Sequence, residues 1–266
     1  MLAKLSVDQT LMKANYHLKR NEFLEAQKLY HAVLLSFPKN IRAQQGLANL
    51  NKTKLKNVRQ NPPQDTVNQL VNLYNQGQLS RSVELAKGLT VKYPEKIIIW
   101  NILGASALQL KMFDEAIKAY KKCIFLNSDY AEAYNNMAVA LKEQGKIKEA
   151  IEALEKCVSI KPDHAEAYSN IGNILSNRGK LEEAIQAYER SISANPNYAE
   201  AYINMGVVFK MQGKLEDAIK AYKKSITLKP DYFITYINMG NAFKEQGDLN
   251  KAIQAYNKVL EFKPDY

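Results

Sequence analysis

The sequence is poor in the residues that carry most enzyme and metal chemistry. Its 266 residues include two cysteines and three histidines, and His17, His31 and His164 stand far from one another along the chain. No Cys or His pair has the spacing of a metal site. No nucleophile–base set or phosphate-binding loop emerges from the sequence either. We therefore predict that the protein is not an enzyme and that it uses neither a metal nor another cofactor.

Long apolar runs are also missing. No run of about 18 apolar residues is present to span a bilayer. The opening stretch MLAKLSVDQTLMKANYHLKR lacks the continuous apolar segment and the small-residue cleavage site of a signal peptide. These absences predict a chain without a transmembrane segment and a cytoplasmic location.

The two cysteines, Cys123 and Cys157, are 34 residues apart. They occupy the same register of a repeating pattern, where a small buried residue is expected. Neighbouring repeats should hold such positions about 10 Å apart, which is beyond the Cα reach of a disulfide. We expect both residues to be reduced packing thiols.

What the sequence does contain is a repeat of 34 residues. Three consecutive copies open with AEAYNNMAVALKEQGK, AEAYSNIGNILSNRGK and AEAYINMGVVFKMQGK. A fixed period of this length is typical of solenoid proteins. The copies begin at Val7, Pro63, Ile97, Ala131, Ala165, Ala199 and Phe233.

Glycine and proline support this register independently. With the first residue of each copy counted as place 1, six of the eight prolines fall at place 32, and nine of the eleven glycines fall at place 8 or 15. These residues end helices or allow helices to approach closely. The prolines are Pro38, Pro94, Pro162, Pro196, Pro230 and Pro264; the glycines are Gly104, Gly172, Gly206 and Gly240 at place 8, and Gly77, Gly145, Gly179, Gly213 and Gly247 at place 15.

Apolar residues between these landmarks recur at helical spacing in two blocks per copy. Tyr168, Ile171 and Leu175 form one such block, and Leu181 and Ile185 open the next. Each block predicts an amphipathic helix of about 14 residues, or about 21 Å. A hairpin of two such helices cannot bury its apolar faces alone, so the hairpins must stack on one another. The sequence therefore predicts an all-α solenoid.

The residues at the key places resemble the tetratricopeptide repeat. The pattern is an aromatic residue at places 4 and 24, Gly or Ala at place 8, Ala at place 20 and Pro at place 32. The resemblance implies helix-turn-helix repeats that form a right-handed superhelix. It covers residues 7–40 and 63–266, and the second range divides into repeats 63–96, 97–130, 131–164, 165–198, 199–232 and 233–266. Places 4 and 20 hold Trp100, Tyr134, Tyr168, Tyr202 and Tyr236, and Ala116, Ala150, Ala184, Ala218 and Ala252.

Residues 1–62 are expected to form a separate N-terminal module, made of the hairpin 7–40 and one extra helix before the double proline Pro62–Pro63. Residues 1–62 carry 11 Lys and Arg against 3 acids, whereas residues 63–266 carry 26 against 24. The net charge of +10 is therefore concentrated at one end of the chain.

A basic patch is expected on this module. It is either a solvated helix face or a surface for an acidic protein, an anionic membrane or nucleic acid. Nucleic acid is disfavoured, since no binding module is recognisable and the aromatic residues lie in core register. An acidic partner or an intramolecular contact is the functional interpretation we prefer. The patch consists of Lys39, Arg42, Lys52, Lys54, Lys56 and Arg59.

The first helix of each repeat should line the concave surface of the superhelix. A row of asparagines follows it, and an asparagine amide can pair with a peptide backbone through a donor and an acceptor. This row resembles the asparagine-lined superhelix beside the catalytic domain of O-linked N-acetylglucosamine transferases; the alternative is that the amides bond between helices. The predicted groove comprises Asn68, Asn136, Asn170, Asn204 and Asn238 at place 6, Asn173 and Asn241 at place 9, and an apolar cluster of Ile203, Val207 and Ile237.

The function predicted from these features is a protein-interaction scaffold that binds an extended polypeptide in the groove. The alternative, implied by the resemblance to bacterial repeat-containing transferases, is the substrate-recruiting region of a larger glycosyltransferase or sulfotransferase. The sequence stops on the last place of a repeat, at Tyr266. We therefore expect Tyr256, Val259, Leu260 and Phe262 to be partly exposed. Three explanations compete: the sequence is part of a longer protein, the chain self-associates through this end, or the native chain tolerates the exposure; we favour the first.

Overall fold

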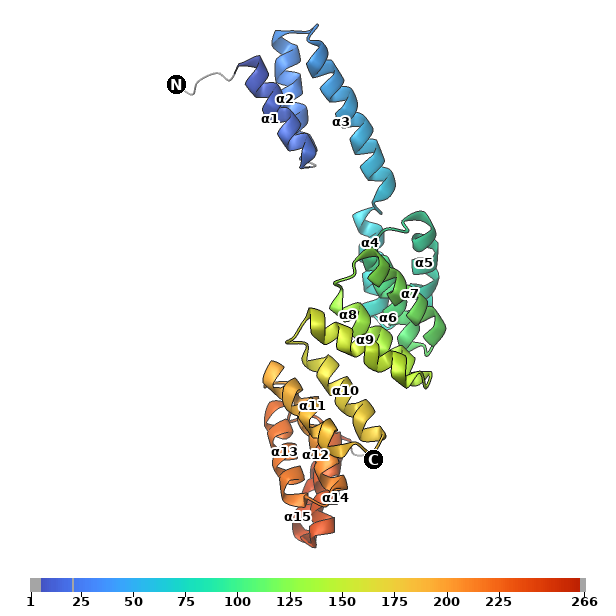
Figure 1. The fold of residues 1–266 in the computed structure, drawn as a ribbon, viewed down its shortest axis with the longest axis vertical. Coiled ribbons are helices and arrows are strands. Elements are labelled where there is room, and N and C mark those ends of the chain that lie inside the picture. Colours follow the sequence, from blue (N-terminus) through green and yellow to red (C-terminus); the bar gives the residue numbers. More distant parts are fainter. Residues whose placement is uncertain (1–5, 21, 264–266) are drawn as a thin grey trace.

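The computed structural model describes residues 6–20 and 22–263, with the backbone alone for residues 54–60. This part of the chain forms fifteen α-helices and no strand. Figure 1 shows them as an elongated stack of hairpins, with α1–α3 at one end and α13–α15 at the other. The prediction of an all-α solenoid of helical hairpins is confirmed. The helices are α1 (Val7–Lys19), α2 (Phe23–Ser36), α3 (Ile41–Gln60), α4 (Gln64–Asn75), α5 (Leu79–Lys92), α6 (Ile97–Gln109), α7 (Phe113–Leu126), α8 (Ala131–Glu143), α9 (Ile147–Ile160), α10 (Ala165–Asn177), α11 (Leu181–Ala194), α12 (Ala199–Met211), α13 (Leu215–Leu228), α14 (Phe233–Gln246) and α15 (Leu249–Phe262).

Each hairpin from α4 to α15 turns through a left-handed residue at place 15. In α10–α11 this residue is Gly179, with φ 73°. The amide of Lys180 donates to the Leu175 carbonyl at 3.0 Å and the amide of Gly179 donates to the Ser176 carbonyl at 2.9 Å, so the free carbonyls of the helix end are satisfied. Five turns use glycine, and α6–α7 uses Lys111 with φ 59°. This conformation costs a non-glycine residue about 1–2 kcal/mol.

In four hairpins of the array, α6–α7, α10–α11, α12–α13 and α14–α15, the two helices meet where a glycine at place 8 faces a tyrosine ring at place 24. A Cβ added to Gly172 would lie 2.5 Å from the Tyr188 ring, and one added to Gly206 would lie 2.6 Å from the Tyr222 ring. Both tyrosines are fully buried. Only glycine therefore permits this approach with tyrosine opposite.

The apolar residues of the array form a chain of cores. The largest core runs from Leu70 in α4 to Ile174 in α10, and a small one joins Tyr188 to Val208. A further core fills the hairpins α12–α13 and α14–α15. Leu70 is the one buried residue of α4. Within the first repeat of the array, α5 therefore contributes more to the shared core than α4 does, through Val83, Ala86 and Leu89.

The helices α1–α3 have a core of their own. Leu11, Tyr30 and Leu50 lie at its centre, and α3 packs on α1 and α2. A Cβ on Gly46 of α3 would lie 2.3 Å from the Tyr30 ring, so glycine again allows a close helix contact. Within the described residues, no helix of this group packs on α4–α15.

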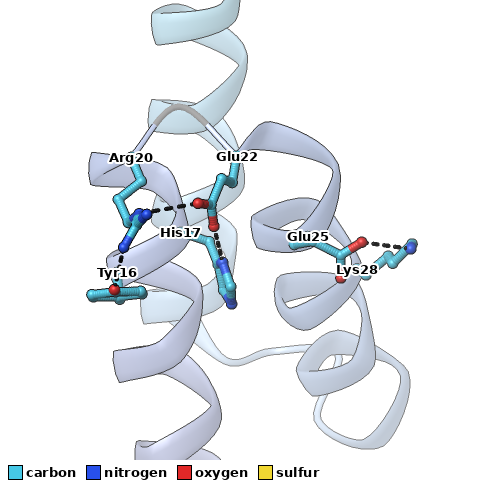
Figure 2. Close-up of polar contacts among 6 residues, drawn as sticks. All are labelled: Tyr16, His17, Arg20, Glu22, Glu25 and Lys28. Carbon is cyan, nitrogen blue, oxygen red and sulfur yellow. Dashed lines mark hydrogen bonds and ion pairs between the residues drawn. The ribbon is translucent and has the colours of Figure 1, made fainter.

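Figure 2 shows the polar contacts at the turn between α1 and α2. The Glu22 carboxylate binds His17 Nδ1 at 2.5 Å and Arg20 Nε at 3.0 Å, while Arg20 donates to the Tyr16 hydroxyl at 2.6 Å. The hydrogen bond with His17 and the nearby Arg20 charge hold the pKa of Glu22 below its usual value. These contacts link the end of α1 to the start of α2 at the surface.

The last helix is only partly as expected. Val259 is buried, which corrects the expectation that it is exposed, because it lies on the inward face of α15. Leu260 and Phe262 are exposed, and the Phe262 ring lies 5.9 Å from the Tyr236 ring. Pro264 and Tyr266 lie outside the described residues.

We predict that Gly206→Ala destabilises the array by about 1–3 kcal/mol, because its methyl group would overlap the Tyr222 ring. The matched control is Gly88→Ala in α5, where nothing lies within 4 Å of the added Cβ. That change should stabilise the helix by about 0.5–1 kcal/mol, since alanine is the better helix former. Urea unfolding of both variants measures the difference. Equal midpoints would contradict the assigned contact.

Candidate functional site

We define the first-helix face as places 2, 5, 6, 9, 12 and 13 of the first helix in each repeat of the array. The place-6 asparagines in α8, α10, α12 and α14 are half-buried, whereas Asn68 in α4 is exposed. Asn68 accepts a hydrogen bond from Gln64 Nε2 at 3.0 Å within its own helix. The row is therefore continuous from α8 to α14, and Asn68 stands apart from it.

Two members of the row bond to each other through a neighbour that the sequence reasoning did not single out. Asn170 Nδ2 donates to Asn135 Oδ1 at 2.9 Å, and Asn135 Nδ2 donates to Asn136 Oδ1 at 3.3 Å. Asn135 is 1% exposed, so this chain of amides lies at the base of the face. It joins α8 directly to α10.

The same relationship recurs one repeat further along. Asn204 Nδ2 in α12 lies 3.5 Å from Ser169 Oγ in α10. Asn238 in α14 has no hydrogen-bond partner among the described residues. Toward the C-terminal end, the asparagines of the row therefore make fewer hydrogen bonds to other residues of the array.

Ion pairs border this face. Lys210 of α12 binds Glu245 of α14 at 2.8 Å, and Glu132 binds Lys161 at 3.2 Å. Glu200 and Lys229 repeat the second contact at 3.5 Å. Lys210 is half-buried and the other side chains are more exposed, so each pair contributes little stability and can exchange partners readily.

The place-9 asparagines are bonded within their hairpins. Asn173 Oδ1 accepts from the Tyr188 hydroxyl at 2.8 Å, and Asn241 Oδ1 accepts from the Tyr256 hydroxyl at 2.8 Å. Each amide keeps its Nδ2 group for another acceptor. The place-9 asparagines thus bond to the second helix through Oδ1 and still offer an Nδ2 donor on the first-helix face.

In α12–α13, place 9 holds Val207 instead of asparagine. The hydroxyl of Tyr222 is buried and has no hydrogen-bond partner among the described residues. Burial raises the pKa of Tyr222 and of Tyr188 above the usual value, so both hydroxyls stay protonated. Tyr222 therefore carries an unmet donor where Tyr188 does not.

The apolar cluster predicted on this face is divided by depth. Ile203 is 6% exposed and belongs to the C-terminal core, whereas Val207 and Ile237 are half-buried. Met211 and Ile234, which flank them on the first-helix face, are 56% and 41% exposed. The accessible apolar surface is therefore made by residues around Ile203 and not by Ile203 itself.

The predicted basic patch is partly neutralised. Arg42 pairs with Asp8 across α3 and α1, while Lys39 and Lys52 have no ion pair among the described residues. The exposed side chains of Phe37 and Ile41 lie on either side of Lys39 in the sequence. Lys54, Lys56 and Arg59 lie outside the residues whose side chains are described.

Reactive thiols, metal binding and membrane spanning have little support in the described part of the chain. Burial raises the pKa of Cys123 to about 12 and that of Cys157 to about 11, so both are neutral thiols at pH 7. No group of three or more His, Cys, Asp or Glu side chains in the described part of the chain could hold a metal ion. None of the described helices is both long and apolar enough to cross a membrane.

Family models place the repeats among known ones. Two models described as tetratricopeptide repeat match residues 131–164, 233–266 and 153–186, and a third, described as TPR repeat, matches residues 107–145, 172–213 and 208–247. The matches together span residues 107–266 without a gap. The chain belongs to the tetratricopeptide-repeat family. The predicted family is thereby confirmed.

Several solved structures resemble the chain. MamA protein is 31% identical, with a TM-score of 0.52, and the match covers 63% of this chain and 92% of MamA. YrrB, described as a TPR protein with an unusual peptide-binding site, is 20% identical with a TM-score of 0.50, over 69% of this chain and 95% of YrrB. PilF of Pseudomonas aeruginosa is 16% identical with a TM-score of 0.64, over 76% and 92%. At the identities of YrrB and PilF the likeness concerns the fold alone. No curated protein matches the sequence.

We predict that Tyr188→Phe destabilises the array by about 0.5–1.5 kcal/mol, because it removes the hydrogen bond to Asn173. Tyr222→Phe should be neutral or slightly stabilising, since its hydroxyl is buried without a partner. Urea unfolding of the two variants gives the comparison. A larger loss for Tyr222→Phe would contradict the assigned hydrogen bonds.

Proposed function

We propose that the first-helix face of the tetratricopeptide array binds an extended segment of another polypeptide. The tetratricopeptide repeats support a protein-interaction scaffold, and YrrB, whose fold resembles that of this chain, is described as a TPR protein with an unusual peptide-binding site. The observation that carries the finer proposal is the row of half-buried amides from Asn136 to Asn238. Amides at a regular spacing suit a ligand main chain, whose own amides are also regularly spaced.

The amides have capacity left for a ligand. Asn170 and Asn204 use their Nδ2 groups toward the preceding first helix, so their Oδ1 atoms remain to accept from ligand N–H groups. Asn173 and Asn241 use Oδ1 within the hairpin and keep Nδ2 to donate to ligand carbonyls. The two rows together offer both kinds of bond that an extended backbone needs.

A ligand side chain is proposed to rest beside this ladder. Val207 and Ile237 are half-buried, and the exposed Met211 and Ile234 extend the apolar surface around them. An aliphatic or aromatic ligand residue would cover this surface and remove it from water. Ile203 would support the cluster from below.

The alternative proposal, recruitment of substrates to a transferase, uses the same face. It rests on the resemblance to the asparagine-lined superhelix of the transferases. Both alternatives require peptide binding by these amides, and they differ in what is joined to the array. The peptide-binding test below therefore precedes any choice between them.

We also propose that the N-terminal module, residues 1–62, contacts an acidic protein partner. Lys39 and Lys52 have no ion pair among the described residues, and Phe37 and Ile41 are 52% and 67% exposed. A cation beside exposed apolar surface suits a partner that presents both a carboxylate and an apolar side chain. The separate core of α1–α3 would let this module act independently of the array.

We predict that the combined Asn170→Ala, Asn204→Ala and Asn238→Ala variant loses most binding to peptides selected by the wild-type protein from a library. Each ladder hydrogen bond contributes only about 0.5–1.5 kcal/mol, so the three changes are combined. Thermal unfolding distinguishes the outcomes. Lost binding by a folded variant supports the ladder, unaltered binding rules it out, and an unfolded variant assigns these asparagines to the scaffold.

For the N-terminal module, Lys39→Glu combined with Lys52→Glu should weaken binding to a glutamate-rich peptide, because charge attraction becomes repulsion. The effect should shrink as salt rises toward 1 M, where the Debye length falls to about 3 Å. Fluorescence anisotropy measures the affinity. Lys118→Glu with Lys121→Glu in the array is the matched control, and equal weakening by the two pairs would show nonspecific attraction only.

A further inference from the structure

The array has a second kind of hollow, which lies between successive second helices and away from the first-helix face. The larger of two such hollows is a cavity of about 500 Å³ between α13 and α15, floored by α14. Its volume lies within the range of sites that hold small ligands or peptide side chains. It is lined by Lys223, Tyr236, Met239, Phe243, Lys251, Gln254, Ala255, Asn257 and Lys258.

The smaller hollow, of about 270 Å³, occupies the equivalent place between α9 and α11. Its lining residues Tyr168, Ile171 and Leu175 fall at the same repeat places as the floor of the larger cavity. This hollow stays open although α12 follows α11 and packs on it. The positions that line both hollows are therefore not those that a following hairpin covers. The hollow therefore recurs at the same repeat places in two parts of the array.

The two hollows differ in the charge of their rims. At place 25 of the preceding repeat, the larger cavity has Lys223 and the smaller hollow has Glu155. At place 19, the larger cavity has Lys251 and the smaller hollow has Glu183. Place 26 holds Lys258 and Arg190, a cation in both cases. With the same backbone frame, the larger cavity thus has three cations and no acid in its lining, and the smaller has two acids and one cation.

The cations of the larger cavity are available to a ligand. Lys223 has no ion pair among the described residues. Lys251 binds Asp248 within one helix turn and lies 5.6 Å above the centre of the Phe243 ring, and Lys258 binds Glu261. Exposed pairs of this kind are weak, so a ligand carboxylate can replace the intrahelical acid at little cost.

We propose that the cavity between α13 and α15 binds an acidic peptide segment that carries a large apolar side chain. The apolar side chain enters above Tyr236, Met239 and Phe243, where it is removed from water. Carboxylates on either side of it meet Lys223 on α13 and Lys251 and Lys258 on α15. The smaller hollow, with Glu155 and Glu183 on its rim, repels the same peptide.

This surface is separate from the proposed peptide ladder. Tyr236, Met239 and Phe243 occupy places 4, 7 and 11 of α14, whereas Asn238 and Asn241 occupy places 6 and 9. The two sets therefore point to different sides of the same helix. One array can thus hold two polypeptide segments at once, a main-chain ligand on one side and an acidic ligand on the other.

The test uses the full chain and a short fluorescein-labelled peptide in which tryptophan and leucine are flanked on both sides by aspartate and glutamate. Fluorescence anisotropy at low salt should show saturable binding. Lys223→Glu combined with Lys251→Glu, which installs the rim of the smaller hollow, should weaken it about tenfold or more, as expected for two repelling exposed contacts. The control pair Lys146→Glu and Lys148→Glu makes the same change in net charge on exposed residues that line neither hollow.

Three outcomes decide the proposal. Weakening by the cavity pair alone, together with loss of affinity when the peptide tryptophan is replaced by alanine, supports it. Equal weakening by both pairs, or no binding by the wild type, overturns it. Should the cavity pair fail to fold, Lys223→Gln with Lys251→Gln is measured in its place under the same criteria. The combined asparagine variant of the first-helix face should keep full affinity for this peptide, so failure of the ladder proposal and failure of this one are distinguishable.

Discussion

In four of the six hairpins of the array, the contact between the glycine at place 8 and the tyrosine ring at place 24 sets how closely the two helices approach. Because Gly172 has no Cβ, its helix and that of Tyr188 approach so closely that an added Cβ would lie 2.5 Å from the tyrosine ring. The tyrosine hydroxyl then reaches place 9, where an asparagine can accept its hydrogen bond. Helix separation, the burial of a large ring and the orientation of one amide row thus follow from a single pair of residues.

Repetition of this contact keeps the backbone frame constant while side chains around it vary. Asn173 and Val207 occupy the same place in successive hairpins, and only the first satisfies the tyrosine hydroxyl. Glu183 and Lys251 occupy the same place two repeats apart and give two hollows of opposite character. Chemical differences along the array are therefore differences of side chain at fixed positions, which makes one repeat a natural control for another.

The sequence predicted most of the fold because the fold is local. The 34-residue period, the glycine at place 15 and the proline at place 32 mark where each helix ends. Each hairpin is therefore specified by residues that are close to one another in the chain. Lys111 adopts the same left-handed turn without glycine, so the hairpin forms there despite the backbone cost. The bonds of Asn135 and the burial of Ile203 depend on how one repeat rotates against the next. That rotation results from packing along the whole stack, and no local pattern encodes it.

The sequence left open whether the asparagines bond between helices or to a ligand, and the hydrogen-bond capacity of an amide reconciles the two. An asparagine side chain has two donors and two lone pairs. Asn170 uses one donor toward Asn135, and Asn173 uses one lone pair toward Tyr188. Each bond to the scaffold fixes the side-chain rotamer and so removes the entropy that a free amide would lose on binding. Structural bonds of this kind orient the remaining donors and acceptors, and a peptide ladder built on them is better ordered than one built on free side chains.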